Sequence, residues 1–258
     1  MSDEFTLDML DIPSSWNRGE GDWMGVAAAI AKGETVEVIQ EVGSTLWQNS
    51  LPEKHSLYWE GENQSPIKGR IWISFTQRRF APESALPKVQ WHPRVLWIGI
   101  GCNAGTSREL IETAIQSVCR AYHLAEGAIA GIATIDTKVS EVGLVELCCL
   151  HHWPLKTFPW NILRTVSVPN PSEIIEKAMG TPSVAEAAAL CATLNLSHAK
   201  TSHLCAGVIP VEETGASRSE GVNPILLVPK QVFRLQGEPG SVTVAVAECL
   251  FHHAQRHQ

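Results

Sequence analysis

The sequence predicts an α/β protein, with a layered α/β/α domain on a mainly parallel or mixed sheet, preceded by a smaller mixed α/β segment. From residue 94 onward, apolar runs of strand length alternate with amphipathic helical segments, as in a sheet that helices cover on both faces. Before that point, six of the nine tryptophans accompany short strand-like runs, which indicates a separate and smaller unit. We therefore expect two parts, residues 1–93 and residues 94–258.

The first part is predicted to contain one short helix and several strands. Its polar, acidic start, to about residue 21, is expected to be a loosely held arm. A helix is predicted over residues 24–31, and residues 77–87 are expected to link the two parts. Strand-like runs lie between this helix and the linker, at residues 35–41, 56–59 and 70–75.

The second part is predicted to begin with a buried strand at residues 95–101. A Gly-rich turn leads from this strand to a helix that starts at Thr106 or Ser107, where Thr106 and Glu109 have the spacing of a capping box. Capping residues predict three further helix starts, at Ser140, Asn170 and Thr181. Apolar runs predict the remaining strands, at residues 128–135, 155–158, 204–211, 225–228 and 241–247.

The charge pattern excludes two classes of partner. The formal net charge is −7 and no run of Lys and Arg is present, so neither nucleic acid nor an anionic membrane is expected to bind. No apolar stretch approaches the roughly 20 residues that span a bilayer. The acidic first residues lack the basic region of a secretory signal, which favours a cytoplasmic protein. Seven cysteines without repeated spacing are expected to be free thiols.

The first candidate binding site is the Gly-rich turn after the strand at residues 95–101. Glycines let the backbone approach a ligand closely, and the unpaired N–H groups that open a helix attract an anion. The spacing matches neither a Walker loop nor GxGxxG, so a tight turn without a ligand is an equal alternative. The candidate residues are Gly99, Gly101, Cys102, Gly105, Thr106 and Ser107.

Two consecutive helix starts form the second candidate binding site. In each, a capping residue is followed by proline, and backbone N–H groups and hydroxyls are presented together. Plain capping is the alternative for either start alone, but three such starts in one α/β domain favour a ligand at the carboxyl ends of the strands. The candidate residues are Asn170, Ser172, Glu173, Gly180, Thr181, Ser183 and Glu186.

Charged side chains that follow the strand at residues 128–135 are the candidates for catalysis. Asp136 and Lys138 lie two residues apart and can face the same side. A lysine beside carboxylates can polarise a carbonyl while a carboxylate acts as a base, and an exposed ion pair between Lys138 and Glu141 is the alternative. The candidate residues are Asp136, Lys138, Glu141 and Glu146. No metal site is expected, because no His or Cys pair has the spacing of metal ligands.

Five motifs occur in order along the second part. They are Gly-Ile-Gly-Cys with Gly-Thr-Ser at 99–107, Ala-Thr-Ile-Asp-Thr-Lys-x-x-Glu-x-Gly-Leu-x-Glu at 133–146, Pro-Asn-Pro-Ser-Glu at 169–173, Gly-Thr-Pro-Ser-Val-Ala-Glu-Ala-Ala-Ala-Leu at 180–190 and Val-Thr-Val-Ala-Val-Ala at 242–247. Together they resemble the C-terminal domain of the CbiG family, which also occurs alone as CobE. Residues 23–52 more loosely resemble the segment that precedes this domain in CbiG.

The resemblance implies a role in cobalamin biosynthesis. CbiG opens the δ-lactone of cobalt-precorrin-5A and releases a two-carbon fragment as acetaldehyde, so a hydrolase-type action on a cobalt corrinoid is expected. Cobalt would belong to the substrate, and no cofactor is expected. On this hypothesis Asp136 or Glu146 is the base, and Lys138 stabilises the developing negative charge. Other enzymes of the pathway are possible partners.

Two departures from the family pattern keep a second hypothesis open. The chain is expected to begin after the family's N-terminal domain, and Asn103 and Ala104 stand where basic residues are expected. The alternative is a non-catalytic, CobE-like module that binds corrinoid intermediates or passes them between enzymes. A third hypothesis is an unrelated α/β enzyme that binds a phosphate at the Gly-rich turn. The sequence indicates no oligomeric state.

Overall fold

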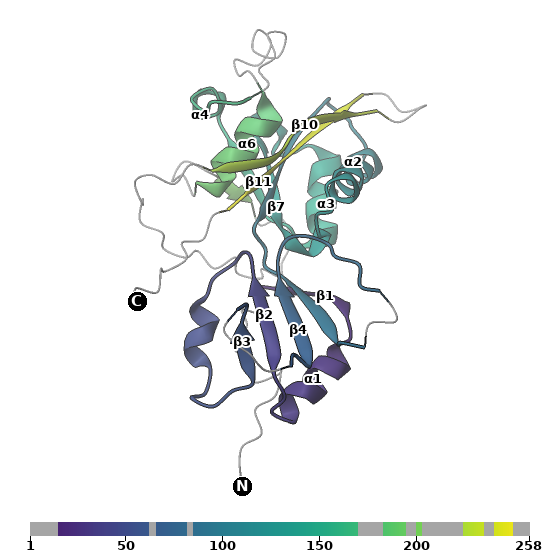
Figure 1. Cartoon of the computed structure of the whole chain (residues 1–258). Coiled ribbons are helices and arrows are strands. Elements are labelled where there is room, and N and C mark those ends of the chain that lie inside the picture. The colour runs from purple at the N-terminus through teal and green to yellow at the C-terminus, as the bar shows by residue number, and fades with distance from the viewer. Residues whose placement is uncertain are drawn as a thin grey trace. The chain divides into compact units, whose positions relative to one another are not determined.

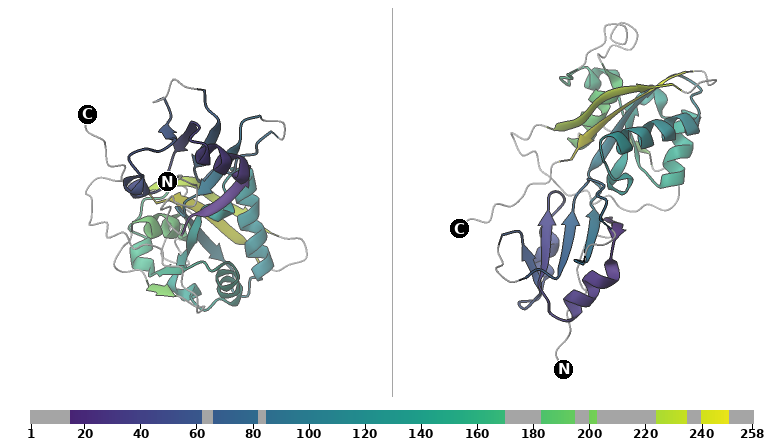
Figure 2. Two further views of the ribbon diagram at one scale, coloured as in Figure 1. Left: turned by 90° about the horizontal axis from the view of Figure 1, so that it is seen from below. Right: turned by 45° about the vertical axis from the view of Figure 1, so that its right-hand side comes forward.

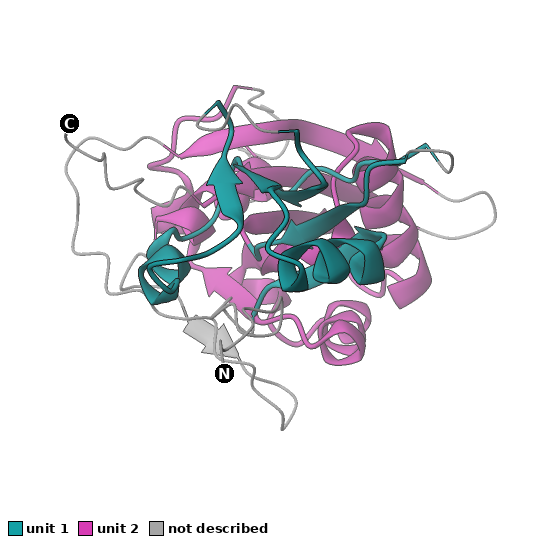
Figure 3. Ribbon diagram, turned by 60° about the horizontal axis from the view of Figure 1, so that its bottom comes forward, with its two compact units in different colours: residues 1–94, 251–258 teal, residues 95–250 magenta. Residues whose placement is uncertain are grey.

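The structure, a computed structural model, describes residues 15–61, 66–81, 85–169, 183–194, 200–202, 224–234 and 240–249. The chain divides into two compact units, and the boundary lies between Arg94 and Val95 (Figure 3). Among the described residues, no helix is long and apolar enough to cross a membrane.

The first unit is built on a five-stranded mixed sheet with the order β1-β5-β4-β2-β3 (Figure 1). Strands β2 to β5 run parallel to one another, and β1 runs antiparallel to β5. The helix α1 (Trp23–Ala31) packs against the sheet through Val26, Ala29 and Ile30. The strands are β1 (Asn17–Gly21), β2 (Val36–Gln40), β3 (Leu57–Trp59), β4 (Gly69–Ile73) and β5 (Lys88–His92).

Two of these strands differ from the sequence prediction. The predicted arm is wrong for residues 17–21, because β1 pairs with β5 despite its polar sequence. Strand β5 was not predicted, because Gln90 and His92 interrupt its apolar pattern although both side chains are buried. Gln90 pairs with the backbone of Arg78, and His92 Nδ1 lies 2.8 Å from the carbonyl oxygen of Ser74. Both polar atoms of the Gln90 side chain are therefore paired in the interior, whereas His92 is paired through Nδ1 only.

The second unit is built on a six-stranded mixed sheet with the order β10-β11-β6-β7-β8-β9. The central strands β6, β7 and β8 are parallel, whereas β11, β10 and β9 each run antiparallel to a neighbour. The predicted strand at residues 204–211 lies outside the described residues. The strands are β6 (Leu96–Cys102), β7 (Ile129–Ile135), β8 (Leu155–Phe158), β9 (Lys200–Ser202), β10 (Ile225–Phe233) and β11 (Val242–Glu248).

Helices cover this sheet on both faces, as Figure 1 and Figure 2 show. The helices α2 (Arg108–Ala121) and α3 (Val142–His151) lie on one face, and α6 (Val184–Thr193) lies on the other. A short helix, α4 (Trp160–Leu163), follows β8, and two 3-10 turns, η3 (Glu126–Ala128) and η4 (Asp136–Lys138), flank β7. The predicted layered α/β/α class with a mixed sheet is therefore confirmed.

The start of α2 corrects the predicted capping box. Ser107 is the N-cap, and its hydroxyl accepts a hydrogen bond from the Leu110 N–H at 3.2 Å. The hydroxyl of Thr106 instead donates to the Asn103 carbonyl oxygen at 2.8 Å, and Thr106 lies one residue before the N-cap. The cap of α3 is likewise Glu141, not the predicted Ser140.

Replacing Ser107 by alanine is expected to lower the free energy of unfolding by about 1 kcal/mol, because the first turn of α2 loses its side-chain acceptor. Urea unfolding followed by circular dichroism measures the change. Ser117→Ala, a substitution at a half-buried position inside the same helix, is the control and should have a smaller effect. Equal effects of the two substitutions would contradict a capping role for Ser107.

Candidate functional site

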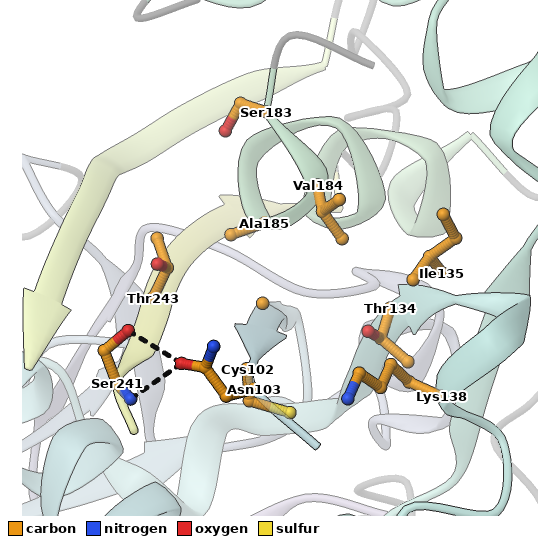
Figure 4. A pocket seen from close by; sticks show the side chains of 11 residues that line it. Cys102, Asn103, Thr134, Ile135, Lys138, Ser183, Val184, Ala185, Ser241 and Thr243 are labelled. Carbon is orange, nitrogen blue, oxygen red and sulfur yellow. Dashed lines mark hydrogen bonds between the residues drawn. The ribbon is translucent and has the colours of Figure 1, made fainter. Parts of the chain in front are cut away.

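A cavity of about 320 Å³ lies at the carboxyl ends of β6 and β7 in the second unit (Figure 4). The starts of α6 and β11 complete its walls. Ligands of open α/β sheets bind outside the carboxyl ends of the strands, so this cavity is the candidate site. Its lining residues are Gly101, Cys102, Asn103, Thr134, Ile135, Lys138, Ser183, Val184, Ala185, Ser241 and Thr243.

Lys138 is the one charged side chain among the described residues that line the cavity. Its Nζ donates a hydrogen bond to Glu141 Oε2 at 2.8 Å. The two side chains are only 13% and 11% exposed, so this is a largely buried ion pair and not the exposed pair considered from the sequence. The site therefore holds a lysine amine, paired with a carboxylate, in a partly buried place where charges interact more strongly than in water.

Glu141 connects Lys138 to the Gly-rich turn. Its other oxygen, Oε1, accepts a hydrogen bond from the Gly105 N–H at 2.6 Å. The Lys138 hydrogen bond is the main cause that lowers the pKa of Glu141, and the Gly105 N–H acts in the same direction. The Gly105 N–H, which was predicted to bind a ligand anion, is thus paired with the Glu141 carboxylate in this structure.

Replacing Glu141 by glutamine is expected to lower stability by about 1 kcal/mol at neutral pH, because the buried ion pair is lost. The folded-state pKa of Glu141 lies below its ordinary value of 4.5, so its contribution is complete above about pH 5. That contribution is lost as the pH falls through the lowered pKa. Unfolding free energies of the two proteins from pH 3 to pH 7 should therefore converge at the acid end, and a constant difference would contradict the assignment.

Cys102 lines the cavity as a thiol. Burial raises its pKa to about 11, although the nearby Lys138 opposes the shift. The group is therefore protonated at neutral pH and is a poor nucleophile.

The structure describes five further cysteines, four of them free thiols as predicted. Burial raises the pKa of each further free cysteine, namely Cys119, Cys148, Cys191 and Cys249. Cys149 forms a disulfide, so the prediction of a free thiol is wrong for this described cysteine. Among the described residues, no group of three or more His, Cys, Asp or Glu side chains could hold a metal ion.

Asn103 joins the turn to β11. Its Oδ1 accepts hydrogen bonds from the backbone N–H and the hydroxyl of Ser241, at 2.9 and 3.1 Å. The side-chain nitrogen points away from Ser241 into the cavity (Figure 4). Asn103 stands where the family resemblance implies a basic residue, and it supplies a neutral donor instead.

The start of α6 forms the opposite wall. Ser183 is the N-cap, is buried, and makes no capping hydrogen bond through its hydroxyl. The first backbone N–H groups of a helix have no partner within the helix and carry a partial positive charge. Ser183 and the first turn of α6 therefore add donors to a wall that faces Lys138 across the cavity (Figure 4).

Several predicted binding residues do not line the cavity. Gly99 packs against α6, because a Cβ at this position would lie 1.9 Å from the Ala185 carbonyl oxygen. Glu186 is fully buried and accepts a hydrogen bond from the Lys230 N–H in β10 at 3.0 Å. Thr106 and Ser107 are engaged at the start of α2, as described above. The remaining candidates lie outside the described residues: Asn170, Ser172, Glu173, Gly180 and Thr181.

The predicted catalytic residues divide into two groups. Lys138 lines the cavity and Glu141 contacts Lys138. Asp136 is partly buried in η4, directly after the cavity residue Ile135, and is not among the lining residues. Glu146 is exposed on α3.

Sequence reasoning missed the contribution of β11 to the site. Ser241 and Thr243 line the cavity because β11 runs antiparallel to β6, with Val242 opposite Cys102 and Thr243 opposite Gly101. The signal in the sequence was a polar Thr243 in an otherwise apolar strand. Its meaning depends on the pairing of β11 with β6, which a single sequence does not reveal.

Comparisons with known proteins cover both units. Residues 96–247 match the family model of the cobalamin synthesis G C-terminus, and residues 5–93 match that of the cobalamin biosynthesis central region. A cobalt-precorrin-5A hydrolase of Priestia megaterium is 28% identical over 171 residues, which are 64% of this chain and 46% of the relative. One of Salmonella typhimurium is 28% identical over 156 residues, 53% of this chain and 44% of the relative. The chain thus spans about half the length of the curated relatives it matches.

Two solved structures are also similar. CobE, a protein from the cobalamin (vitamin B12) biosynthetic pathway, has 24% sequence identity and a TM-score of 0.46, covering 62% of this chain and 94% of CobE. The cobalamin biosynthesis protein chiG from Agrobacterium tumefaciens has 25% identity and a TM-score of 0.37, covering 60% of this chain and 98% of chiG.

Proposed function

This chain belongs to the cobalamin synthesis G family, and from that membership we propose that its second unit binds a cobalt-corrinoid intermediate and takes part in opening its δ-lactone. The resemblance to CbiG and CobE drawn from the five motifs is confirmed by the family match. The observation that carries the proposal is the desolvated Lys138 amine in the cavity at the carboxyl ends of β6 and β7.

The donors around the cavity suit the chemistry of such a ligand. Corrin precursors carry acetate and propionate arms, and a protein with a net charge of −7 must bind them through local donors. Lys138, the Asn103 amide and the start of α6 supply these donors from three sides. We infer that one arm of the macrocycle, including the lactone, enters the cavity.

The reaction would proceed in two steps. Water adds to the lactone carbonyl carbon and the ring C–O bond breaks, which leaves a carboxylate and a hydroxyl group. A base then takes the hydroxyl proton as the adjacent C–C bond breaks and the C=O bond of acetaldehyde forms. The electron pair of the broken bond passes into the conjugated macrocycle, which takes up a proton as acetaldehyde leaves. Lys138 would stabilise the negative charge that develops on the carbonyl oxygen in the first step. Cobalt takes part as a component of the substrate.

Asp136 is the carboxylate that we assign as the base. It directly follows the cavity residue Ile135, whereas Glu146 is exposed on α3. Glu141 is less suited, because its two hydrogen bonds lower its pKa and occupy both oxygens. A general base needs a free oxygen within reach of the proton that it removes.

Replacing Asp136 by asparagine is expected to lower acetaldehyde release by about 10²- to 10⁴-fold while leaving corrinoid binding intact. Glu146→Gln is the matched control and should release acetaldehyde at the rate of the unmodified chain. Single-turnover release and a binding titration measure the two quantities separately. Loss of binding and turnover together in Asp136→Asn would mean that Asp136 has a structural role.

A specific observation favours a second candidate, a non-catalytic module that binds or passes corrinoid intermediates. No carboxylate is present among the described lining residues, so the cavity itself offers donors but no base. The chain also spans only 46% and 44% of the two curated relatives, so it need not carry out the complete reaction that they carry out.

Incubation with cobalt-precorrin-5A separates the two candidates. Acetaldehyde is measured by its reduction with alcohol dehydrogenase and NADH, and binding is measured by the change in the visible spectrum of the corrinoid. Binding with acetaldehyde release supports the hydrolase-type action, and binding without release supports the module. An unchanged spectrum at high micromolar protein would exclude both.

A further inference from the structure

We propose that Trp160 and Arg164, at the carboxyl end of β8, form a platform on which the corrin macrocycle rests outside the cavity. This inference rests on the proposed function and adds a recognition site to it. The platform would contact the conjugated ring through the indole and a peripheral carboxylate through the guanidinium.

The position of α4 places the platform at the same edge of the sheet as the cavity. Phe158, the last residue of β8, pairs with the cavity residue Ile135 at the end of β7. Trp160 begins α4 two residues later (Figure 1). Adjacent strands lie about 5 Å apart, so α4 starts two residues beyond a residue that lies one strand spacing from the end of β7.

Packing anchors α4 beside the cavity wall. Leu163 is fully buried and belongs to one apolar cluster with Ile135 and Val184, two residues that line the cavity. The position of Trp160 is thus set by the same core that sets the cavity.

The two side chains are exposed and already arranged for a flat anionic ligand. Trp160 is 47% exposed, and the Arg164 guanidinium carbon lies 4.8 Å from the centroid of its ring. An arginine over an indole gains cation–π attraction and keeps its outer N–H groups for a carboxylate. Val139 and Val142, 39% and 65% exposed, add apolar surface around η4 at the same edge.

The size of the cavity requires such a surface. A volume of about 320 Å³ is at the lower end of the range for sites that enclose a small molecule. A corrinoid has four pyrrole-derived rings and many carboxylate arms, so the cavity can enclose one arm but not the macrocycle. The rest of the ligand must lie outside the cavity, and the exposed indole of Trp160 lies at the same end of the strands.

Visible-absorption titration of the full chain with cobyrinic acid, a cobalt corrinoid with free carboxylates, tests the platform. Trp160→Ala is expected to raise Kd about tenfold. Arg164→Gln is expected to raise Kd for cobyrinic acid about threefold and to leave Kd for cobinamide, whose arms are amides, unchanged. Tyr122→Ala, at a 42% exposed aromatic residue at the far end of α2, is the matched control and should leave Kd unchanged.

The outcomes separate this inference from the proposed function. If the unmodified chain binds cobyrinic acid and Trp160→Ala binds it equally well, the platform is wrong while the cavity proposal stands. An Arg164→Gln effect that is equal for both corrinoids would overturn the carboxylate contact. If the unmodified chain binds neither corrinoid, the proposed function fails, and the platform fails with it.

Discussion

Replacing Lys138 by methionine is expected to lower kcat/KM for acetaldehyde release by about 10²- to 10³-fold, the effect of removing one preorganised donor from a carbonyl site. Lys138 is the one charged side chain among the described residues that line the cavity, and it is only 13% exposed. Methionine keeps most of the side-chain volume, so the shape of the cavity is retained. Single-turnover kinetics with cobalt-precorrin-5A measure the change.

The control must separate charge loss from loss of folding. Lys138→Met alone removes the ion pair with Glu141 and leaves the largely buried carboxylate without that partner, which lowers the free energy of unfolding. The double variant Lys138→Met/Glu141→Gln removes both charges and should recover part of this stability without recovering turnover. Lys32→Met, at an exposed lysine of the first unit, controls for net charge. Normal turnover by the double variant would contradict the role of Lys138.

Replacing Gly99 by alanine is expected to have the largest effect on stability of the substitutions proposed for this chain. The free energy of unfolding should fall by about 1 to 3 kcal/mol. The added Cβ would lie 1.9 Å from the Ala185 carbonyl oxygen and 2.9 Å from the Ala189 Cβ, so α6 must move away from β6. Because Ala185 also lines the cavity, corrinoid binding should weaken as well. Urea unfolding and a binding titration measure the two effects.

Gly101 provides the matched control two residues along the same strand. A Cβ there would meet its nearest atoms, in Thr243 and Val184, at 3.7 and 3.9 Å, which is ordinary contact. Gly101→Ala should therefore change stability little, although it narrows the cavity that Gly101 lines. Equal unfolding midpoints for the two variants would show that the close approach of α6 to β6 is not what requires glycine at position 99.

Buried parallel strands were predictable from the sequence because their signal is local. Strands β6 and β7 are continuous apolar runs, and the amphipathic period of α2 is regular. Strand β10 was predicted only to residue 228, because Pro229 interrupts it. The strand continues to Phe233 because β10 is an edge strand, where proline is tolerated, and its register shifts around this residue.

The candidate site was predictable only at residues that belong to a local sequence motif. Gly101 and Cys102 were identified from the Gly-rich turn, Lys138 from the end of a strand and Ser183 from a helix start. All four line one cavity. Asn103, Ser241 and Thr243 were not identified, because their place depends on the antiparallel pairing of β11 with β6. Ser107 caps α2 through the Leu110 N–H, whereas the Thr106 hydroxyl donates to the Asn103 carbonyl oxygen, a contact that capping rules do not include.

Locating the metal of a bound cobalt corrinoid tests the central claim most directly. Crystals of the full chain grown with cobyrinic acid would give an anomalous signal from cobalt alone. The account predicts one cobalt position at the carboxyl edge of the second unit, between the cavity at Lys138 and the indole of Trp160. A cobalt position over the first unit, or at the opposite edge of the β6–β8 strands, would contradict it.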